Sequence, residues 1–276
     1  MKNFIIRTIS GAVYVALISL SILYGPYSFL TLFAIITGLC LWELYSLLEK
    51  HSETRIDKPI ATFGGVYLFV SSFLGFAGII PFYYMSLWFL VMLFLLIKEL
   101  YNKQDNPINT LAYTFFGQIY IGLSMMFLAR MGFSGNAAED SNYSPVFLMS
   151  FFVLIWSCDT GAYMVGSTLG KHRMFERISP KKSWEGFFGG LLFTVIAAII
   201  ISMLFPGYLS LSKWIIFALI TVAFDTWGDL VESMIKRSLK VKDSGNMIPG
   251  HGGILDRLDS CLLAAPAVVI YLMFFL

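Results

Sequence analysis

The densest charged stretch of the chain reads GDLVESMIKRSLKVKDSGNMIPGHGGILDRLD and spans residues 228–259. It joins two apolar runs, 211–235 and 259–276, which approach the roughly 20 residues that a helix needs to cross hydrocarbon. Charged side chains are costly near hydrocarbon, so a polar stretch between two membrane-spanning segments indicates a functional site. The flanking runs predict a helical membrane protein with a polar site at the membrane surface.

The composition of the whole chain points to the same class of protein. Its 276 residues are 58% hydrophobic and 13% charged, and the mean hydropathy is +0.76. Soluble domains carry roughly 25% charged residues, so this composition indicates an integral membrane protein. Cys40, Cys158 and Cys261 stand alone in apolar runs, which argues against a disulfide framework or a thiolate metal site. Because no Gly/Ser linker or repeat interrupts the chain, we expect one integral membrane domain over residues 1–276.

Apolar runs of spanning length recur along the chain and predict an all-α, polytopic membrane protein with about nine transmembrane helices. The first run lacks a small-residue cleavage site before Gly25-Pro26, so we interpret it as a retained span rather than a signal peptide. The runs are 8–25, 27–48, 61–80, 82–100, 110–130, 145–169, 185–205, 211–235 and 259–276.

Basic residues give the orientation of these spans. All but two of the 19 Lys and Arg residues lie in the N-terminal tail or in the second, fourth, sixth and eighth loops. The exceptions are Arg130 and Lys213. Because cytoplasmic loops carry an excess of Lys and Arg, this alternation predicts a cytoplasmic N-terminus and a cytoplasmic charged stretch.

Three blocks of the charged stretch carry a resemblance to a known family. They are Ser233-Met-Ile-Lys-Arg237, Lys242-Asp-Ser-Gly245, and Pro249-Gly-His-Gly-Gly-Ile-Leu-Asp-Arg-Leu-Asp259. Together they closely resemble the signature of the phosphatidate cytidylyltransferases (CDP-diacylglycerol synthases). A further block, Ser179-Pro-Lys-Lys-Ser-Trp-Glu-Gly186, resembles a second recurring block of that family.

The resemblance implies a membrane enzyme of phospholipid biosynthesis that transfers CMP from CTP to phosphatidate, giving CDP-diacylglycerol and pyrophosphate. It implies the cell (inner) membrane as the location, with the active site on the cytoplasmic side. The implied partners are CTP, phosphatidate and the lipid bilayer, without nucleic acid, and a homodimer stays open as an assembly.

The polar residues of the eighth run share a helical face. Asp225, Asp229, Glu232 and Lys236 follow one another at i, i+4, i+7 and i+11. The alternative to a functional face is a salt-bridged stripe against a neighbouring helix. Asp225 lies outside the signature, and we expect the isolated Glu43 of the second run to be a structural hydrogen-bonding partner.

The chemistry of the implied reaction assigns roles within the signature. Carboxylate oxygens are ligands that Mg²⁺ prefers, and we expect Asp229 and Asp256 to bind Mg²⁺, with Asp243 and Asp259 in support. Basic side chains would hold phosphates, and backbone N–H groups of the turn around Gly252 and Gly253 would assist. His251 is open to three interpretations: a phosphate ligand, a proton carrier or a hydrogen-bonded spacer. The expected catalytic set comprises Asp229, Lys236, Arg237, Lys242, Asp243, His251, Asp256, Arg257 and Asp259.

A second set of residues is expected to bind substrate. Asp159 lies deep in the sixth run and needs a partner, for which the basic loops are the nearest source. Ser183 is placed to cap the seventh helix, which would put Lys181 and Lys182 beside a helix N-terminus that suits a phosphate. Alternatively, this basic loop binds anionic lipid headgroups. The expected substrate-binding set comprises Asp159, Lys181, Lys182, Ser183, Glu185, Ser233, Gly252 and Gly253.

Two other functions remain open from the residues alone. A cation-coupled transporter would also place acids within its spans, but nearer the bilayer midplane than the charges of this chain. A lipid-alcohol kinase acting on polyprenol or phytol would need similar phosphate-binding groups. The spacing of the signature favours the cytidylyltransferase over the kinase.

Overall fold

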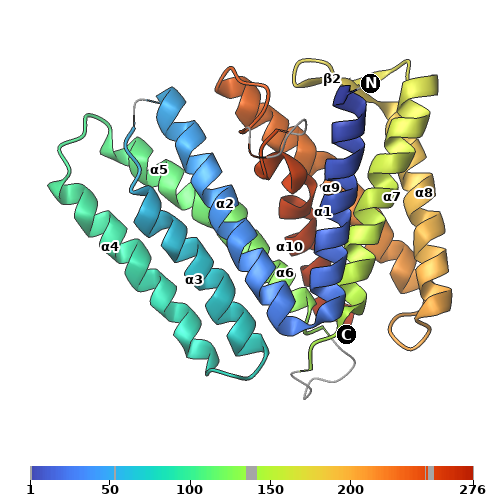
Figure 1. Cartoon of the computed structure of the whole chain (residues 1–276), viewed down its shortest axis with the longest axis horizontal. Coiled ribbons are helices and arrows are strands. Elements are labelled where there is room, and N and C mark those ends of the chain that lie inside the picture. The colour runs from blue at the N-terminus through green and yellow to red at the C-terminus, as the bar shows by residue number, and fades with distance from the viewer. Residues whose placement is uncertain (1, 53, 135–141, 246, 248–251, 276) are drawn as a thin grey trace.

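The computed structural model describes residues 2–52, 54–134, 142–245, 247 and 252–275, with side chains from residue 8 onward within these ranges. The chain folds into a bundle of long helices and one short hairpin (Figure 1). The helices are α1 (Lys2–Tyr24), α2 (Pro26–Ser52), α3 (Lys58–Phe76), η1 (Phe82–Ser86), α4 (Leu87–Tyr101), α5 (Pro107–Gly117), η2 (Gln118–Leu123), α6 (Ser124–Met131), α7 (Pro145–Leu169), α8 (Trp184–Leu204), α9 (Leu211–Ser238), η3 (Leu255–Arg257) and α10 (Asp259–Phe275). The antiparallel strands are β1 (Arg173–Phe175) and β2 (Ser179–Ser183).

Each apolar run of the sequence forms a helical segment in the described part of the chain. Seven of these segments are long and apolar enough to cross a membrane, and Thr8–Tyr24 and Asp259–Phe275 are shorter apolar helices. The chain is therefore an all-α, polytopic membrane protein. Nine crossings and a cytoplasmic N-terminus stay predictions.

Two local differences from the predicted elements have clear causes. The third run was predicted to stay helical to residue 80, but α3 ends at Phe76. Gly78 adopts a left-handed φ of 67°, and Pro81 disfavours helix in the residue before it, so the chain turns there. The basic segment before α8, predicted as a loop, pairs instead as the β1–β2 hairpin.

Aromatic side chains fill the centre of the bundle. Phe29 of α2 contacts Phe69 and Phe73 of α3, and Phe33 of α2 contacts Phe152 of α7. All five rings are fully buried. Helices in lipid associate through close van der Waals packing rather than through the hydrophobic effect, so these interlocked rings hold α2, α3 and α7 together.

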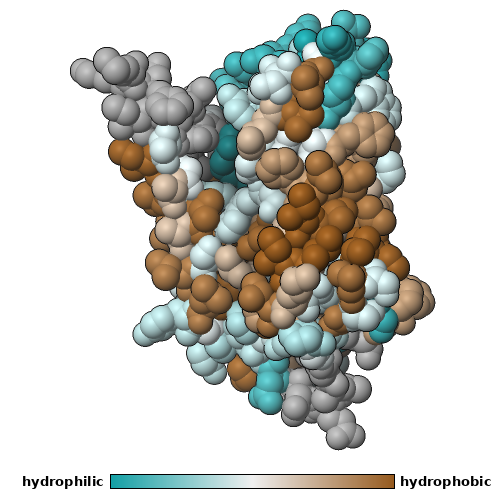
Figure 2. Space-filling model, turned by 90° about the vertical axis from the view of Figure 1, so that its right-hand side faces the viewer, coloured by the Kyte–Doolittle hydropathy of each residue, from teal (hydrophilic) through white to brown (hydrophobic). Residues whose placement is uncertain are grey.

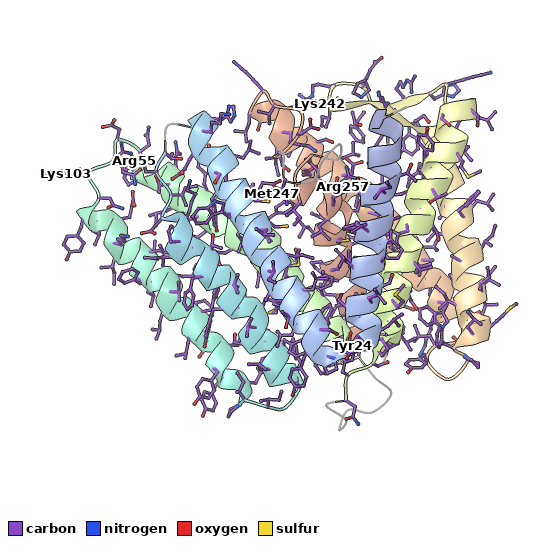
Figure 3. The ribbon with its side chains drawn as sticks, in the orientation of Figure 1. Tyr24, Arg55, Lys103, Lys242, Met247 and Arg257 are labelled. Atoms are coloured by element: carbon purple, nitrogen blue, oxygen red, sulfur yellow. The ribbon has the colours of Figure 1, made fainter. Side chains whose placement is uncertain are left out.

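The outer surface has the polarity of a membrane protein. On the face drawn in Figure 2, hydrophobic residues form a band across the middle, and hydrophilic residues gather toward the two ends. Figure 3 shows Arg55, Lys103 and Lys242 toward one end of the molecule and Tyr24 toward the other. The basic loops that the sequence assigns to one side of the membrane therefore do lie at one end of the bundle.

Helices α7, α8, α9 and α10 form the part of the bundle that frames the site, with α1 lying alongside α7 (Figure 1). Glycines allow α7 and α8 to pack closely, since a Cβ on Gly161 would lie only 2.7 Å from the carbonyl oxygen of Gly189. The hairpin and the loop after α9 lie at the same end of these helices. This arrangement brings the two sequence blocks of the predicted site together.

Candidate active site

A cavity of about 580 Å³ lies between α7, the β1–β2 hairpin, α8 and α9. Its polar lining includes three carboxylates, Asp159, Asp225 and Asp229, and the cationic side chains Arg173, Lys181 and Lys182. Ser183 and Ser260 complete the polar lining, with Ser179, Ser167 and Thr226. We call this the larger cavity. It combines hard oxygen ligands with cations on one surface, as a site that binds metal ions and phosphates requires.

The hairpin sets Lys182 against α9. The Lys182 ammonium lies 2.8 Å from Oδ2 of Asp229 and donates to the carbonyl oxygen of Thr226 at 3.2 Å. Ser233, one turn along α9, donates to Oδ1 of Asp229 at 3.1 Å. Asp229 is partly exposed to the cavity, so its pairing with Lys182 is one that an incoming ligand can exchange.

Ser183 ends the hairpin and begins α8. Its hydroxyl accepts a hydrogen bond from the Gly186 N–H at 3.2 Å, which confirms the predicted N-cap. Glu185 in the first turn accepts from the backbone N–H groups of Lys171 and His172, at 3.1 Å in each case. Glu185 therefore steadies the start of the hairpin and does not itself line the larger cavity.

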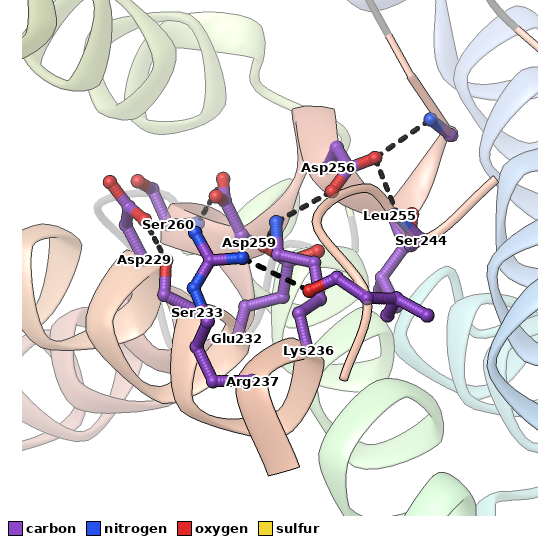
Figure 4. Close-up of polar contacts among 12 residues, drawn as sticks. Asp229, Glu232, Ser233, Lys236, Arg237, Ser244, Leu255, Asp256, Asp259 and Ser260 are labelled. Atoms are coloured by element: carbon purple, nitrogen blue, oxygen red, sulfur yellow. Dashed lines mark hydrogen bonds and ion pairs between the residues drawn. The ribbon is translucent and has the colours of Figure 1, made fainter. Parts of the chain in front are cut away.

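A second network joins the end of α9 to the loop that follows it. Lys236 lies 2.5 Å from Oε2 of Glu232 and 2.6 Å from Oδ1 of Asp256, and its side chain is only 12% exposed (Figure 4). The other oxygen of Asp256 accepts from the N–H groups of Ser244, at 3.0 Å, and Gly253, at 2.8 Å. Asp256 therefore links the Ser244 and Gly253 ends of the loop to Lys236 of α9.

The contacts of Asp256 also determine its ionisation. Burial alone would raise its pKa, but the Lys236 ammonium and the N–H groups of Gly253 and Ser244 outweigh burial and lower the pKa below its ordinary value of 3.8. Asp256 is therefore a stable carboxylate at neutral pH.

A smaller cavity of about 270 Å³ lies between α1, α7 and the start of α10. It shares Asp159 and Ser260 with the larger cavity. The rest of its lining is part apolar and part charged: Ser10, Gly11, Tyr14, Val15, Ile155, Trp156, Asp256, Arg257 and Asp259. The Asp159 carboxylate therefore lines both cavities.

Within the described part of the chain, eight of the 17 predicted residues line the two cavities: Asp159, Lys181, Lys182, Ser183, Asp229, Asp256, Arg257 and Asp259. Ser233, Lys236, Gly252 and Gly253 line neither cavity, although Ser233 donates to Asp229, and Lys236 and Gly253 donate to Asp256. Arg237 is exposed and donates to its own loop at the Val241 carbonyl oxygen, and Lys242 and Asp243 are exposed beyond both cavities. Asp159 was expected to have a basic partner. Instead it faces the cavities and makes no ion pair within the described residues. His251 lies outside the described residues.

Three polar residues that line the cavities, Arg173, Ser260 and Tyr14, were not among the predicted site residues. Arg173 was one basic residue among several in its loop, and only the hairpin turns it toward the larger cavity. Ser260 directly follows the signature and could have been included on that ground. Tyr14 on α1, whose hydroxyl donates to the Arg257 carbonyl oxygen at 2.9 Å, gives no signal in the sequence.

The donor set of the larger cavity fits a hard cation such as Mg²⁺. Oδ1 of Asp225 is buried and has no hydrogen-bond partner among the described residues, which is costly unless a cation or water satisfies it. In the described part of the chain no three His, Cys, Asp or Glu side chains form a complete metal cage. Mg²⁺ does not need one, because it usually binds through one or two carboxylates and keeps waters beside substrate phosphates.

Comparison with known proteins assigns the sequence to a family. The model of the cytidylyltransferase family matches residues 5–275. A phosphatidate cytidylyltransferase of Haemophilus influenzae is 31% identical over 280 residues, which cover 94% of this chain and 95% of that protein. The protein of the same name from Bacillus subtilis is 36% identical over 65% of this chain and 63% of its own length. One from Staphylococcus aureus is 41% identical over 55% of each chain. The chain belongs to the cytidylyltransferase family.

Proposed function

We propose that this protein is a phosphatidate cytidylyltransferase, which transfers CMP from CTP to phosphatidate and releases pyrophosphate. The observation that carries the proposal is the larger cavity, where Arg173, Lys181 and Lys182 face Asp159, Asp225 and Asp229. The names of the relatives at 31–41% identity supply the substrates.

The reaction needs charge neutralisation more than proton transfer. An oxygen of the phosphatidate monoester attacks the α-phosphorus of CTP, a new P–O bond forms, and the bond to the β-phosphate oxygen breaks. A phosphate monoester has its second pKa near 6, so the attacking oxygen is already largely ionised at neutral pH. The protein therefore has to hold two polyanions together, and cationic side chains do this.

The two cavities provide a place for each substrate. The larger cavity carries the cationic side chains and fits the triphosphate of CTP. The smaller cavity has an apolar wall of Val15, Ile155 and Trp156, which suits the glycerol and acyl part of a lipid. Val15 is 38% exposed on α1, so a lipid can reach this wall from the bilayer. The phosphates of the two substrates would then meet near Asp159, which lines both cavities.

We propose Mg²⁺ as the cofactor. Asp229 and Asp256 are the carboxylates expected to hold it, and Asp225 joins them as a candidate because of its unpartnered oxygen. When bound, Mg²⁺ would neutralise negative charge on the phosphates and on the leaving pyrophosphate. Asp256 would have to loosen its contact with Lys236 to bind a metal, whereas Asp229 already faces the larger cavity.

The proposal includes a location. We propose that the chain resides in the cell (inner) membrane with both cavities reached from the cytoplasmic half. The concentration of basic residues at the end of the bundle that carries the hairpin supports this orientation.

Pyrophosphate release by the purified protein tests the proposal. We expect release only when CTP, phosphatidate and Mg²⁺ are all present. Phosphorylation of a polyprenol or phytol without pyrophosphate release would show a kinase instead, and cation flux in liposomes without any turnover would show a transporter.

A further inference from the structure

Glu43 lies in α2, about 200 residues before the loop that joins α9 to α10 (residues 239–258, here the signature loop), yet its side chain reaches that loop. Its carboxylate accepts hydrogen bonds from the Ser244 hydroxyl, from the Ile254 N–H at 3.0 Å and from the Leu255 N–H at 3.3 Å. Glu43 is only 6% exposed. One buried acid therefore binds the loop at two separate places, Ser244 and the 254–255 segment.

Asp256, within the same loop, also binds at Ser244 and directly beside the 254–255 segment. It accepts from the N–H groups of Ser244 and Gly253, while Glu43 takes the Ser244 hydroxyl and the next two N–H groups after Gly253. Ser244 is held by both acids at once. Lys236 then links Asp256 to α9, so the contacts run without a break from α2 through the loop to α9.

The glycines of the loop fit this contact. A Cβ on Gly245 would lie 2.9 Å from the carboxyl carbon of Glu43, and a Cβ on Gly253 would collide with the Glu43 carboxylate and the Ser244 hydroxyl. The backbone can approach Glu43 only because these two positions lack side chains. The close approach of Glu43 therefore requires glycine at both positions.

Glu43 makes no ion pair within the described residues. A buried carboxylate without a cation is costly unless hydrogen bonds satisfy it, and here the loop supplies the donors. The Glu43 carboxylate needs these donors of the loop, and the loop donors in turn need Glu43 as their acceptor.

We infer that Glu43 is the positioning residue of the signature loop, which holds Asp256, Arg257 and Asp259 in place at the smaller cavity. Glu43 lines neither cavity and acts through Ser244 and the 253–255 segment. The inference concerns the loop itself, and only its effect on turnover rests on the proposed function.

Glu43→Gln tests this inference because it keeps the size of the side chain but replaces an acceptor oxygen with an NH₂ donor. The matched control is Glu99→Gln in α4, a Glu that is 8% exposed and accepts from Asn102 at 2.9 Å, far from the loop. Hydrogen exchange of the purified protein without substrate reads the loop directly. Steady-state kinetics with CTP and phosphatidate and the thermal unfolding midpoint are measured on the same samples.

We expect the amides of Ile254 and Leu255, which donate to Glu43, to exchange at least about tenfold faster in Glu43→Gln than in the wild-type protein or in Glu99→Gln. We expect kcat to fall by at least about tenfold with little change in the KM for CTP, because the larger cavity is untouched. The unfolding midpoint should shift no more than in the control variant.

Unchanged exchange in the loop would overturn the inference, and so would faster exchange with an unchanged kcat, which would show a merely structural contact. If Glu43→Gln does not fold, Ser244→Ala tests the inference instead. This variant removes one donor to Glu43 but keeps Glu43 itself, and we expect faster exchange in the same amides. Unchanged exchange there would also overturn the inference. If the wild-type protein releases no pyrophosphate, the proposed function fails, and the exchange measurement still tests the loop.

Discussion

Asp256 and Asp229 were expected from the sequence to act alike, but their surroundings differ. Both oxygens of Asp256 accept from protein donors, and its side chain is 6% exposed. Asp229 is 36% exposed, faces the larger cavity, and is paired only with Lys182 and Ser233 among the described residues. Removing the charge of Asp229 and removing that of Asp256 should therefore affect turnover and stability differently.

Asp229→Asn should cut turnover by about two orders of magnitude or more while leaving stability nearly unchanged, because it removes a charge in the larger cavity. Asp256→Asn should also lower turnover, but it should cost about 3 kcal/mol of unfolding free energy, because Lys236 loses a buried partner. Activity titrated with Mg²⁺ and denaturant unfolding check the two effects. Near-normal turnover of both variants at low Mg²⁺ would contradict the metal assignment and leave the acids as partners of the lysines.

The lowered pKa of Asp256 predicts a pH dependence with a definite sign. A carboxylate whose pKa is lower in the folded than in the unfolded state stabilises the fold above its unfolded-state pKa, and this stabilisation is lost as the pH falls through the folded-state value. The difference in unfolding free energy between the wild-type protein and Asp256→Asn should stay constant from about pH 7 to pH 5 and shrink below about pH 4. Denaturant unfolding at stepped pH measures it. A difference that grows as the pH falls would be inconsistent with the contacts described.

Among the helices, α1 contributes a wall to the smaller cavity. Gly11 lines the smaller cavity, and a Cβ added there meets no atom within 4 Å, so a side chain can be introduced at this position. Gly11→Phe should fill the smaller cavity and raise the KM for phosphatidate by about tenfold, with the KM for CTP unchanged, because CTP is assigned to the larger cavity.

Leu17→Phe provides the control for Gly11→Phe, since Leu17 lies on the same helix and is 53% exposed. Its KM values should match those of the wild-type protein. A rise in the KM for CTP instead of phosphatidate in Gly11→Phe would reverse the assignment of the two cavities.

The helices and one helix cap could be predicted from the sequence, whereas the hairpin and the long-range contact of Glu43 could not. The helices were predictable because hydrocarbon requires long apolar segments whose backbone groups pair within the helix, and this pattern is visible in the sequence. The N-cap at Ser183 was predictable from local chemistry. The hairpin was not, because strands of three and five residues leave almost no periodic signal. Nor was the contact of Glu43 with the loop, because it joins residues about 200 apart and depends on how α2 packs.

At the scale of the whole molecule, the basic loops lie at one end of the bundle, and this asymmetry predicts the topology. A cysteine at the exposed Asn106, before α5, should be protected from an impermeant thiol reagent in intact cells, and one at the exposed Ser210, before α9, should be labelled. Background should be low because Cys40, Cys158 and Cys261 are buried. Labelling of the Asn106 variant from outside would refute the cytoplasmic assignment of the N-terminus and the hairpin.

The fate of the CTP phosphates distinguishes a cytidylyltransferase from a lipid kinase. The purified protein is supplied with phosphatidate and Mg²⁺ and with CTP labelled either at the α- or at the γ-phosphate, and the lipid products are extracted into chloroform. A cytidylyltransferase moves the α-phosphate onto the lipid, so we expect the α-label in the lipid phase and the γ-label in aqueous pyrophosphate. The γ-label in the lipid phase, with the α-label left in water, would show a lipid kinase and contradict the proposed transfer of CMP from CTP to phosphatidate.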